Sequence, residues 1–370
     1  MKFTKTLLTT ALFSFSVFSI SQMGYAKTND AELVQQAILS GGEQLLRVVE
    51  AIKKNEFDTA ISLAQPLAEQ GNVMAQSALA LAYESREEYF QAFKWYQKAA
   101  EQGYARAQFY LALMYDNGQG VKQDYFQAFK WYQKAAEQGH IKAQYNLGQM
   151  YRTGQGVKQD YFQAFKWYQK AAEQGHIKAQ YNLGQMYRTG QGVKQDDFQA
   201  FKWYQKAAEQ GHIKAQYDLG QMYRTGQGVK QDYFQAFKWY QKAAEQGDAQ
   251  AQYNLGVMYD NGHGVKQDYF QAFKWYQKVA EQGDAQAQYN LGVMYHKGEG
   301  VKQDDFQAVK WNQKAAEQGY ADAQLNLGIM YALGEGVKQD LNLAKMWAGK
   351  ACENGEQKGC NVYHMLNEGK

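Results

Sequence analysis

The side chains that could act as acids, bases or metal ligands are few, and the most conspicuous recur at one spacing. His140, His176 and His212 are 36 residues apart, and imidazole is both a general base near neutral pH and a common metal ligand. Side chains in successive helical repeats lie roughly 10 Å or more apart, too far to share one ion. We therefore predict that these histidines are solvated turn residues and not metal ligands.

Motifs of known catalytic chemistry do not stand out from the repeating pattern. We find no Ser-His-Asp arrangement, phosphate-binding glycine loop or isolated pair of carboxylates. The recurring Gly-x-Gly, as at Gly154 and Gly156, is a weak phosphate-binding signal and has a simpler explanation as a helix terminator. The sequence predicts no catalytic, cofactor-binding or metal-binding residues, and hence a protein that is not an enzyme.

The helices that would position any site come from a tandem repeat. The motif Ala-Gln-Tyr-Asn-Leu-Gly recurs with variations every 36 residues, and such self-similarity indicates a solenoid. Residues 75–106 form a degenerate copy that lacks four residues in its loop. Seven full repeats then begin at Ala107, Ala143, Ala179, Ala215, Ala251, Ala287 and Ala323.

The repeat at residues 143–178 predicts two helices joined by a glycine loop. Ala143, Leu147 and Met150 have the spacing of an apolar helical stripe. The first helix is expected to end at Gly154, because glycine adopts left-handed backbone conformations at little cost.

The second helix of this repeat is expected to run from Asp160, its N-cap, to about Gln174. Gln163 gives the spacing of a capping box. The apolar face around Ala164 and Trp167 is broad enough to contact both its own first helix and the next repeat. One tryptophan per repeat is therefore predicted to be core: Trp95, Trp131, Trp167, Trp203, Trp239, Trp275, Trp311 and Trp347.

The pattern A-x-x-x-L-G-x-x-Y-x-x-G-x-G-V-x-x-D-x-x-x-A-x-x-W-x-x-x-A-A-x-x-G, from Ala143 to Gly175, closely resembles the Sel1-like repeat, a relative of the tetratricopeptide repeat. The resemblance implies an all-α, right-handed superhelical solenoid of helix pairs. Its concave surface would hold proteins or peptides, and it implies no catalytic residues. Exported bacterial members are associated with envelope complexes and with contact to host cells.

Two functions follow from this resemblance. The first is a protein-protein interaction scaffold or adaptor. The alternative is a hydrolase acting on the cell wall or on β-lactams, which is claimed for some cysteine-rich relatives; the repeats offer no nucleophile-base pair for it.

A candidate binding stripe lies opposite the apolar stripe of the first helix, on the side that would be concave. It consists of a Tyr, a Gln and an Arg spaced i, i+4 and i+7. Tyr and Arg are common at binding hot spots, although duplication of the repeat alone would also copy such a stripe. Its members are Tyr145, Gln149, Arg152, Tyr181, Gln185, Arg188, Tyr217, Gln221 and Arg224.

Charge along the chain suggests where an acidic partner would bind. Residues 143–214 contain ten Lys or Arg against five Asp or Glu, whereas residues 251–322 contain seven against nine. On the second helix, Phe162 and its equivalents fall on the polar side. We predict that these phenylalanines cover Val157. The alternative is that they form an exposed adhesive ridge.

The two cysteines lie at the end of the last repeat. Cys352 replaces an alanine of the second helix and Cys360 replaces the glutamine at the start of the next helix, positions that face each other across a turn. We predict a disulfide, which cysteine-rich members of the family form with the same spacing; free thiols or a metal pair are the alternatives. The bond would attach a final helix, Asn361 to Asn367, to the array.

The N-terminus predicts export. Lys2 and Lys5 precede an apolar stretch, and Ala26 and Lys27 flank the expected cleavage site of a signal peptide. No cysteine follows for lipid attachment, and we expect a periplasmic or secreted protein without a membrane span. Loss of the signal peptide reduces the formal charge from +3 to about +1, which argues against nucleic acid as a partner.

Arrays of this kind could also associate end to end. The predicted organisation has five parts. These parts are a signal peptide (1–26), an N-terminal helical cap with a half repeat (27–74), the degenerate repeat (75–106), seven repeats (107–358) and a C-terminal capping helix (359–370).

Overall fold

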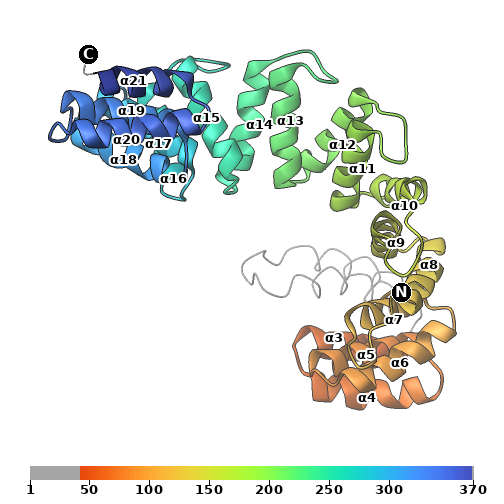
Figure 1. Cartoon of the computed structure of the whole chain (residues 1–370). Coiled ribbons are helices and arrows are strands. Elements are labelled where there is room, and N and C mark those ends of the chain that lie inside the picture. Colours follow the sequence, from red (N-terminus) through yellow and green to blue (C-terminus); the bar gives the residue numbers. More distant parts are fainter. Residues whose placement is uncertain (1–41, 369–370) are drawn as a thin grey trace, which may run out of the picture. The chain divides into compact units, whose positions relative to one another are not determined.

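The computed structural model describes residues 42–368 (Figure 1). Within this range it contains nineteen helices and no strand, which confirms the predicted all-α hairpin repeat. The predicted signal peptide and its cleavage site lie outside the described residues. No helix in the described range is both long and apolar enough to cross a membrane.

The chain divides into two compact units, one ending at Gln159 and the other beginning at Asp160. The first contains α3 (Glu43–Lys53), α4 (Phe57–Glu69), α5 (Val73–Ser85), α6 (Tyr89–Glu101), α7 (Ala105–Asn117), α8 (Tyr125–Glu137) and α9 (Ile141–Thr153). The second contains α10 (Tyr161–Glu173), α11 (Ile177–Thr189), α12 (Asp197–Glu209), α13 (Ile213–Thr225), α14 (Tyr233–Glu245), α15 (Ala249–Asn261), α16 (Tyr269–Ala280), α17 (Ala285–Lys297), α18 (Asp305–Glu317), α19 (Ala321–Leu333), α20 (Leu341–Glu353) and α21 (Gln357–Glu368).

The predicted helix ends agree with the structure. α9 ends at a left-handed cap, Gly154, whose φ is 78°. α10 begins after Asp160, whose carboxylate accepts a hydrogen bond from the backbone N–H of Gln163 at 3.0 Å. The final helix, α21, begins four residues before the predicted Asn361.

In α6, α8, α10, α12, α14 and α16 a buried tyrosine, and not the tryptophan beside it, occupies the centre of the hairpin. Tyr204 in α12 is fully buried, and a Cβ added to Gly184 in α11 would lie 2.7 Å from its ring. Glycine on the first helix therefore lets the tyrosine ring approach. The tryptophans lie in the seam between hairpins, where Trp239 packs against a cluster that includes Phe201. The predicted tryptophan core is confirmed for Trp239, which is buried, whereas Trp203 is only half-buried.

A buried glutamine joins each hairpin to the one before it. In the second unit, the Gln216 side chain in α13 donates to the backbone carbonyl of Ala208 at the end of α12, at 3.1 Å. Its own side-chain oxygen accepts a hydrogen bond from Gln246, which follows α14, at 2.7 Å. The equivalent glutamines that are also buried are Gln76, Gln108, Gln144, Gln180, Gln252, Gln288 and Gln324.

The second glycine of Gly-x-Gly is required by contact between repeats. Gly192 has φ +70°, and a Cβ there would lie 2.2 Å from the backbone oxygen of Tyr161 in the preceding repeat. Gly211 also has positive φ, +90°, but a Cβ there would meet nothing within 4 Å.

We predict that Gly192→Ala destabilises the protein by about 2 to 4 kcal/mol, because it adds a steric clash to the cost of a left-handed conformation. Gly211→Ala, the matched control, should cost about 1 to 2 kcal/mol from conformation alone. Urea unfolding followed by circular dichroism measures both. Equal losses would show that the contact with Tyr161 is unimportant.

The recurring histidines cap helices. In the second unit, Nδ1 of His212 accepts a hydrogen bond from the backbone N–H of Ala215 at 3.2 Å, and its ring stacks on Tyr181 with centroids 4.5 Å apart. In the first unit, His140 caps α9 in the same way. These residues are therefore structural and half-buried, and the prediction of solvated turn residues was wrong in this respect.

Burial lowers the pKa of both histidines, that of His140 from its ordinary 6.5 to about 4, with a smaller effect from nearby Arg106 and Lys142. Because the folded state disfavours the proton, the stability from these caps is complete above pH 6.5 and is lost as the pH falls through the lowered pKa.

We predict that the variant His140→Asp, His212→Asp loses less stability between pH 6.5 and 4.5 than the wild type, by about 1 kcal/mol per residue. Aspartate already caps α15 and α17 in this chain, so the fold should accept it. Thermal unfolding at a series of pH values tests this. Parallel pH profiles for the two proteins would contradict it.

The structure pairs the two cysteines. Cys352 in α20 and Cys360 in α21 form a disulfide, with Cα atoms 4.5 Å apart. The bond closes a short loop between the last two helices, and chain entropy predicts a stabilisation of about 2 to 3 kcal/mol.

We predict that the double variant Cys352→Ala, Cys360→Ala loses this stabilisation and frays at α21. The wild type should lose the same amount on reduction, whereas the variant should be insensitive to reductant. Hydrogen exchange of the α21 amides, with and without dithiothreitol, provides the measurement. Unchanged exchange in the reduced wild type would refute the capping role.

Candidate partner-binding surface

The predicted Tyr-Gln-Arg stripe forms a hydrogen-bonded row on a single helix. In α13 the side-chain amide of Gln221 donates to the hydroxyl of Tyr217 at 2.6 Å, and Nε of Arg224 donates to Gln221 at 2.9 Å. In the first unit, Tyr145, Gln149 and Arg152 of α9 make the same two contacts. The row orders its side chains before any partner binds.

In α11 the row is joined to the next hairpin through Asp218. The hydroxyl of Tyr181 donates to this carboxylate at 3.1 Å, and Arg188 lies 3.4 Å from it. Gln185 donates to the same tyrosine hydroxyl at 3.0 Å. Burial raises the pKa of Asp218, while Arg188 and Tyr181 oppose this rise. Arg188 is therefore neutralised within the chain, which sequence reasoning did not anticipate.

A signal for Asp218 was present in the sequence. The equivalent position in the neighbouring repeats is Asn182 or Asn254, so this single aspartate is a departure from the pattern. Its significance depends on the position of Arg188 in α11, which the sequence alone does not give.

The arginines also lie beside the central tyrosines. The hydroxyls of Tyr204 and Tyr240 are buried without a hydrogen bond of regular geometry. Burial raises the pKa of both, and Arg188 and Arg224, respectively, lower it in part. Each arginine therefore covers the hydroxyl end of the tyrosine in its own hairpin.

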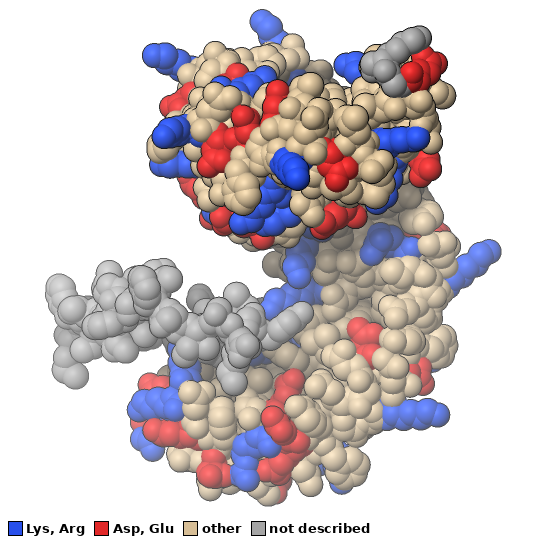
Figure 2. All heavy atoms as spheres, turned by 60° about the vertical axis from the view of Figure 1, so that its left-hand side comes forward, with Lys and Arg blue, Asp and Glu red and all other residues tan. Residues whose placement is uncertain are grey.

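Farther along the second unit the row changes its charge. Asp260 in α15 and His296 in α17 occupy the position of the arginines. Burial raises the pKa of Asp260, as does Glu299, whereas Lys297 lowers it. His296 lies 2.8 Å from Asp305 of α18. Figure 2 shows Lys and Arg interspersed with Asp and Glu on one face of the molecule.

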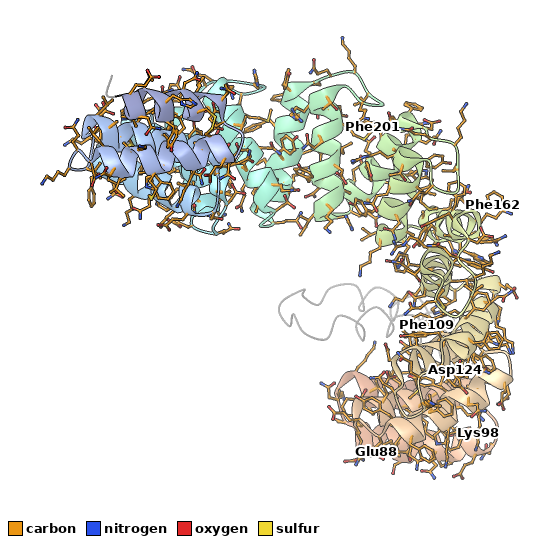
Figure 3. The ribbon with its side chains drawn as sticks, in the orientation of Figure 1. Glu88, Lys98, Phe109, Asp124, Phe162 and Phe201 are labelled. Atoms are coloured by element: carbon orange, nitrogen blue, oxygen red, sulfur yellow. A yellow bond between two sulfur atoms is a disulfide. The ribbon has the colours of Figure 1, made fainter. Side chains whose placement is uncertain are left out.

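The second helices present phenylalanines on their outer side. Phe162 is 53% exposed and points outward from α10 (Figure 3). The ammonium group of Lys166 lies 4.2 Å from the centroid of its ring, a cation-π geometry. The proposed cover over Val157 remains a prediction.

Within residues 42–368, no three His, Cys, Asp or Glu side chains are grouped so that they could hold a metal ion. The arrangement offers hydrogen bonds, aromatic surface and charge, which are the means of recognising a polypeptide.

Comparison with known proteins identifies the repeat. The Sel1 repeat family model matches at residues 73–104, 105–140, 141–176, 177–212, 213–248, 249–284, 285–320 and 321–356. No curated protein matches the sequence significantly.

Two solved structures resemble the chain over most of its length. One is c5321, a protective antigen of uropathogenic Escherichia coli with an SLR fold: identity is 34%, coverage is 92% of this chain and 91% of that one, and the TM-score is 0.53. The other is a Sel1 repeat protein from Oxalobacter formigenes, with 36% identity, coverage of 83% and 90%, and a TM-score of 0.58. With eight consecutive matches spanning more than half of its length, the chain belongs to the Sel1 repeat family.

Proposed function

We propose that this chain is an exported scaffold that binds protein partners through the Tyr-Gln-Arg rows of its first helices. Sel1 repeat proteins are generally protein-interaction scaffolds. The observation that carries the proposal is that α9, α11 and α13 each have a pre-ordered row of their own.

The row has the properties of a recognition surface. Its tyrosines are half-buried and its arginines exposed, and neither belongs to the central core. Because hydrogen bonds within the row already hold the side chains, a partner would lose little conformational entropy in ordering them.

Charge points to acidic partner segments, one at α9 of the first unit and one at α13 of the second. Within residues 42–368, Arg188 forms an ion pair with Asp218, but no carboxylate forms one with Arg152 or Arg224. These two guanidinium groups remain available for carboxylates of a partner, with which arginine forms bidentate hydrogen bonds.

The placement outside the cytoplasm rests on the N-terminal sequence, which has the parts of a signal peptide. Similarity over 92% of the chain to a protective antigen of uropathogenic Escherichia coli supports a role in the envelope or in contact with a host.

We predict that the variant Arg152→Ala, Arg188→Ala, Arg224→Ala loses its partner without loss of helicity. Asp218→Asn should be added, because asparagine occupies this position in neighbouring repeats and no buried carboxylate is then left without its arginine. The measurement is a pull-down from the producing organism's envelope fraction, with residues 27–370 as bait.

The control is Lys166→Ala, Lys202→Ala, which makes the same net change in charge on exposed positions of α10 and α12. A protein retained by the wild type and by this control, but not by the arginine variant, is expected. Equal retention by all three baits would refute binding through the row.

A further inference from the structure

A polar cavity of about 250 Å³ opens between α15, α16 and α17 of the second unit. Its lining includes Asp260, Tyr276, Asn290, Lys297 and Glu299. The volume is smaller than the roughly 300 to 1,000 Å³ of pockets that enclose drug-sized ligands. It suits a single side chain. We call this cavity the Asp260 pocket.

The equivalent place two repeats earlier shows what fits it. There Arg188 stands where Asp260 does, Tyr204 where Tyr276 does, and Asp218 where Asn290 does. The guanidinium group of Arg188 lies 3.4 Å from Asp218 and beside the hydroxyl of Tyr204. In the repeat directly before the pocket, Arg224 lies beside Tyr240 in the same manner.

Replacement of arginine by aspartate removes the side chain that covered the tyrosine. The Tyr276 hydroxyl instead lies beside Asp260 and Asn290, much as the Tyr132 hydroxyl donates to Asp116 at 3.2 Å in the first unit. Because aspartate is much shorter than arginine, part of the space stays open.

The pocket offers a guanidinium group complementary partners. Its lining has two carboxylates and one ammonium group, Lys297, which lies 3.8 Å from Glu299. The lining therefore has a net negative charge. Asp260, Tyr276 and Asn290 supply oxygen acceptors from three helices, which suits the planar, multiply donating group of arginine better than the point charge of lysine.

We infer that the Asp260 pocket takes an arginine side chain of a protein partner, in the place that Arg188 and Arg224 hold in their own repeats. This inference rests on the proposed scaffold function and adds the chemistry of one anchoring residue. On this basis, an earlier part of the array supplies arginines to a partner and a later part receives one.

The test is a selection of random peptides displayed on phage against the immobilised chain. The blocked variant is Asp260→Arg, Asn290→Asp, which copies the residues of the Arg188 site and fills the pocket from within. We expect arginine to be enriched among peptides that the wild type retains and the blocked variant does not. Replacing that arginine with lysine or citrulline should weaken binding of a selected peptide at least about tenfold.

Two further variants separate filling from charge and from misfolding. Glu281→Gln makes the same net change in charge, +1, at an exposed position of the same repeat and should bind the peptides normally. Asp260→Asn keeps the size of the side chain and should weaken binding without any change in fold.

Two results would refute arginine binding by the Asp260 pocket while leaving the scaffold function in place. The selected peptides could show no enrichment of arginine, or they could bind the blocked variant as well as the wild type. A selection from which the wild type retains no peptide would count against both.

Discussion

The hydrogen bonds of the buried glutamines are the interaction on which the array depends. A buried side-chain amide left without partners costs about 1 to 3 kcal/mol. The buried Gln216 amide avoids this cost because it donates to the Ala208 carbonyl, which also accepts the backbone N–H of Gly211, and its oxygen accepts from Gln246. A single side chain thus connects the end of one helix, the start of the next hairpin and the end of that hairpin. Its recurrence at every repeat makes stacking specific where alanine contacts alone would permit sliding.

Once the stacking is fixed, the surface positions are free to vary without risk to the fold. Tyrosine against glycine, as in Tyr204 and Gly184, fills the hairpin, and the tryptophans close the seams. The Arg188 position lies outside both sets. It can therefore be arginine, aspartate or histidine in different repeats, and each choice leaves a different chemical surface over the same tyrosine. Binding specificity can change there one repeat at a time.

The sequence predicted the architecture well because helix ends are decided locally. Gly154 ends α9 and Asp160 caps the start of α10, and both effects depend on local backbone hydrogen bonds and conformation that need no tertiary context. The site was predicted only as a stripe of residue types. Gln216 looked like an ordinary polar residue, since its burial is known only when the preceding helix is in place. For the same reason His212 was taken for a solvated residue, and Asp218 was overlooked although it differs from its equivalents.

Near-identity between repeats limits what conserved positions can reveal, because duplication copies useful and neutral residues alike. The departures are more informative. Asp218 departs where Arg188 needs a counterion, and Asp260 departs where the loss of an arginine opens a cavity. Both changes act on the same space beside a central tyrosine, one filling it from within and the other leaving it open. In a protein built from copies, a site is most readily found where the copies differ while their surroundings stay the same.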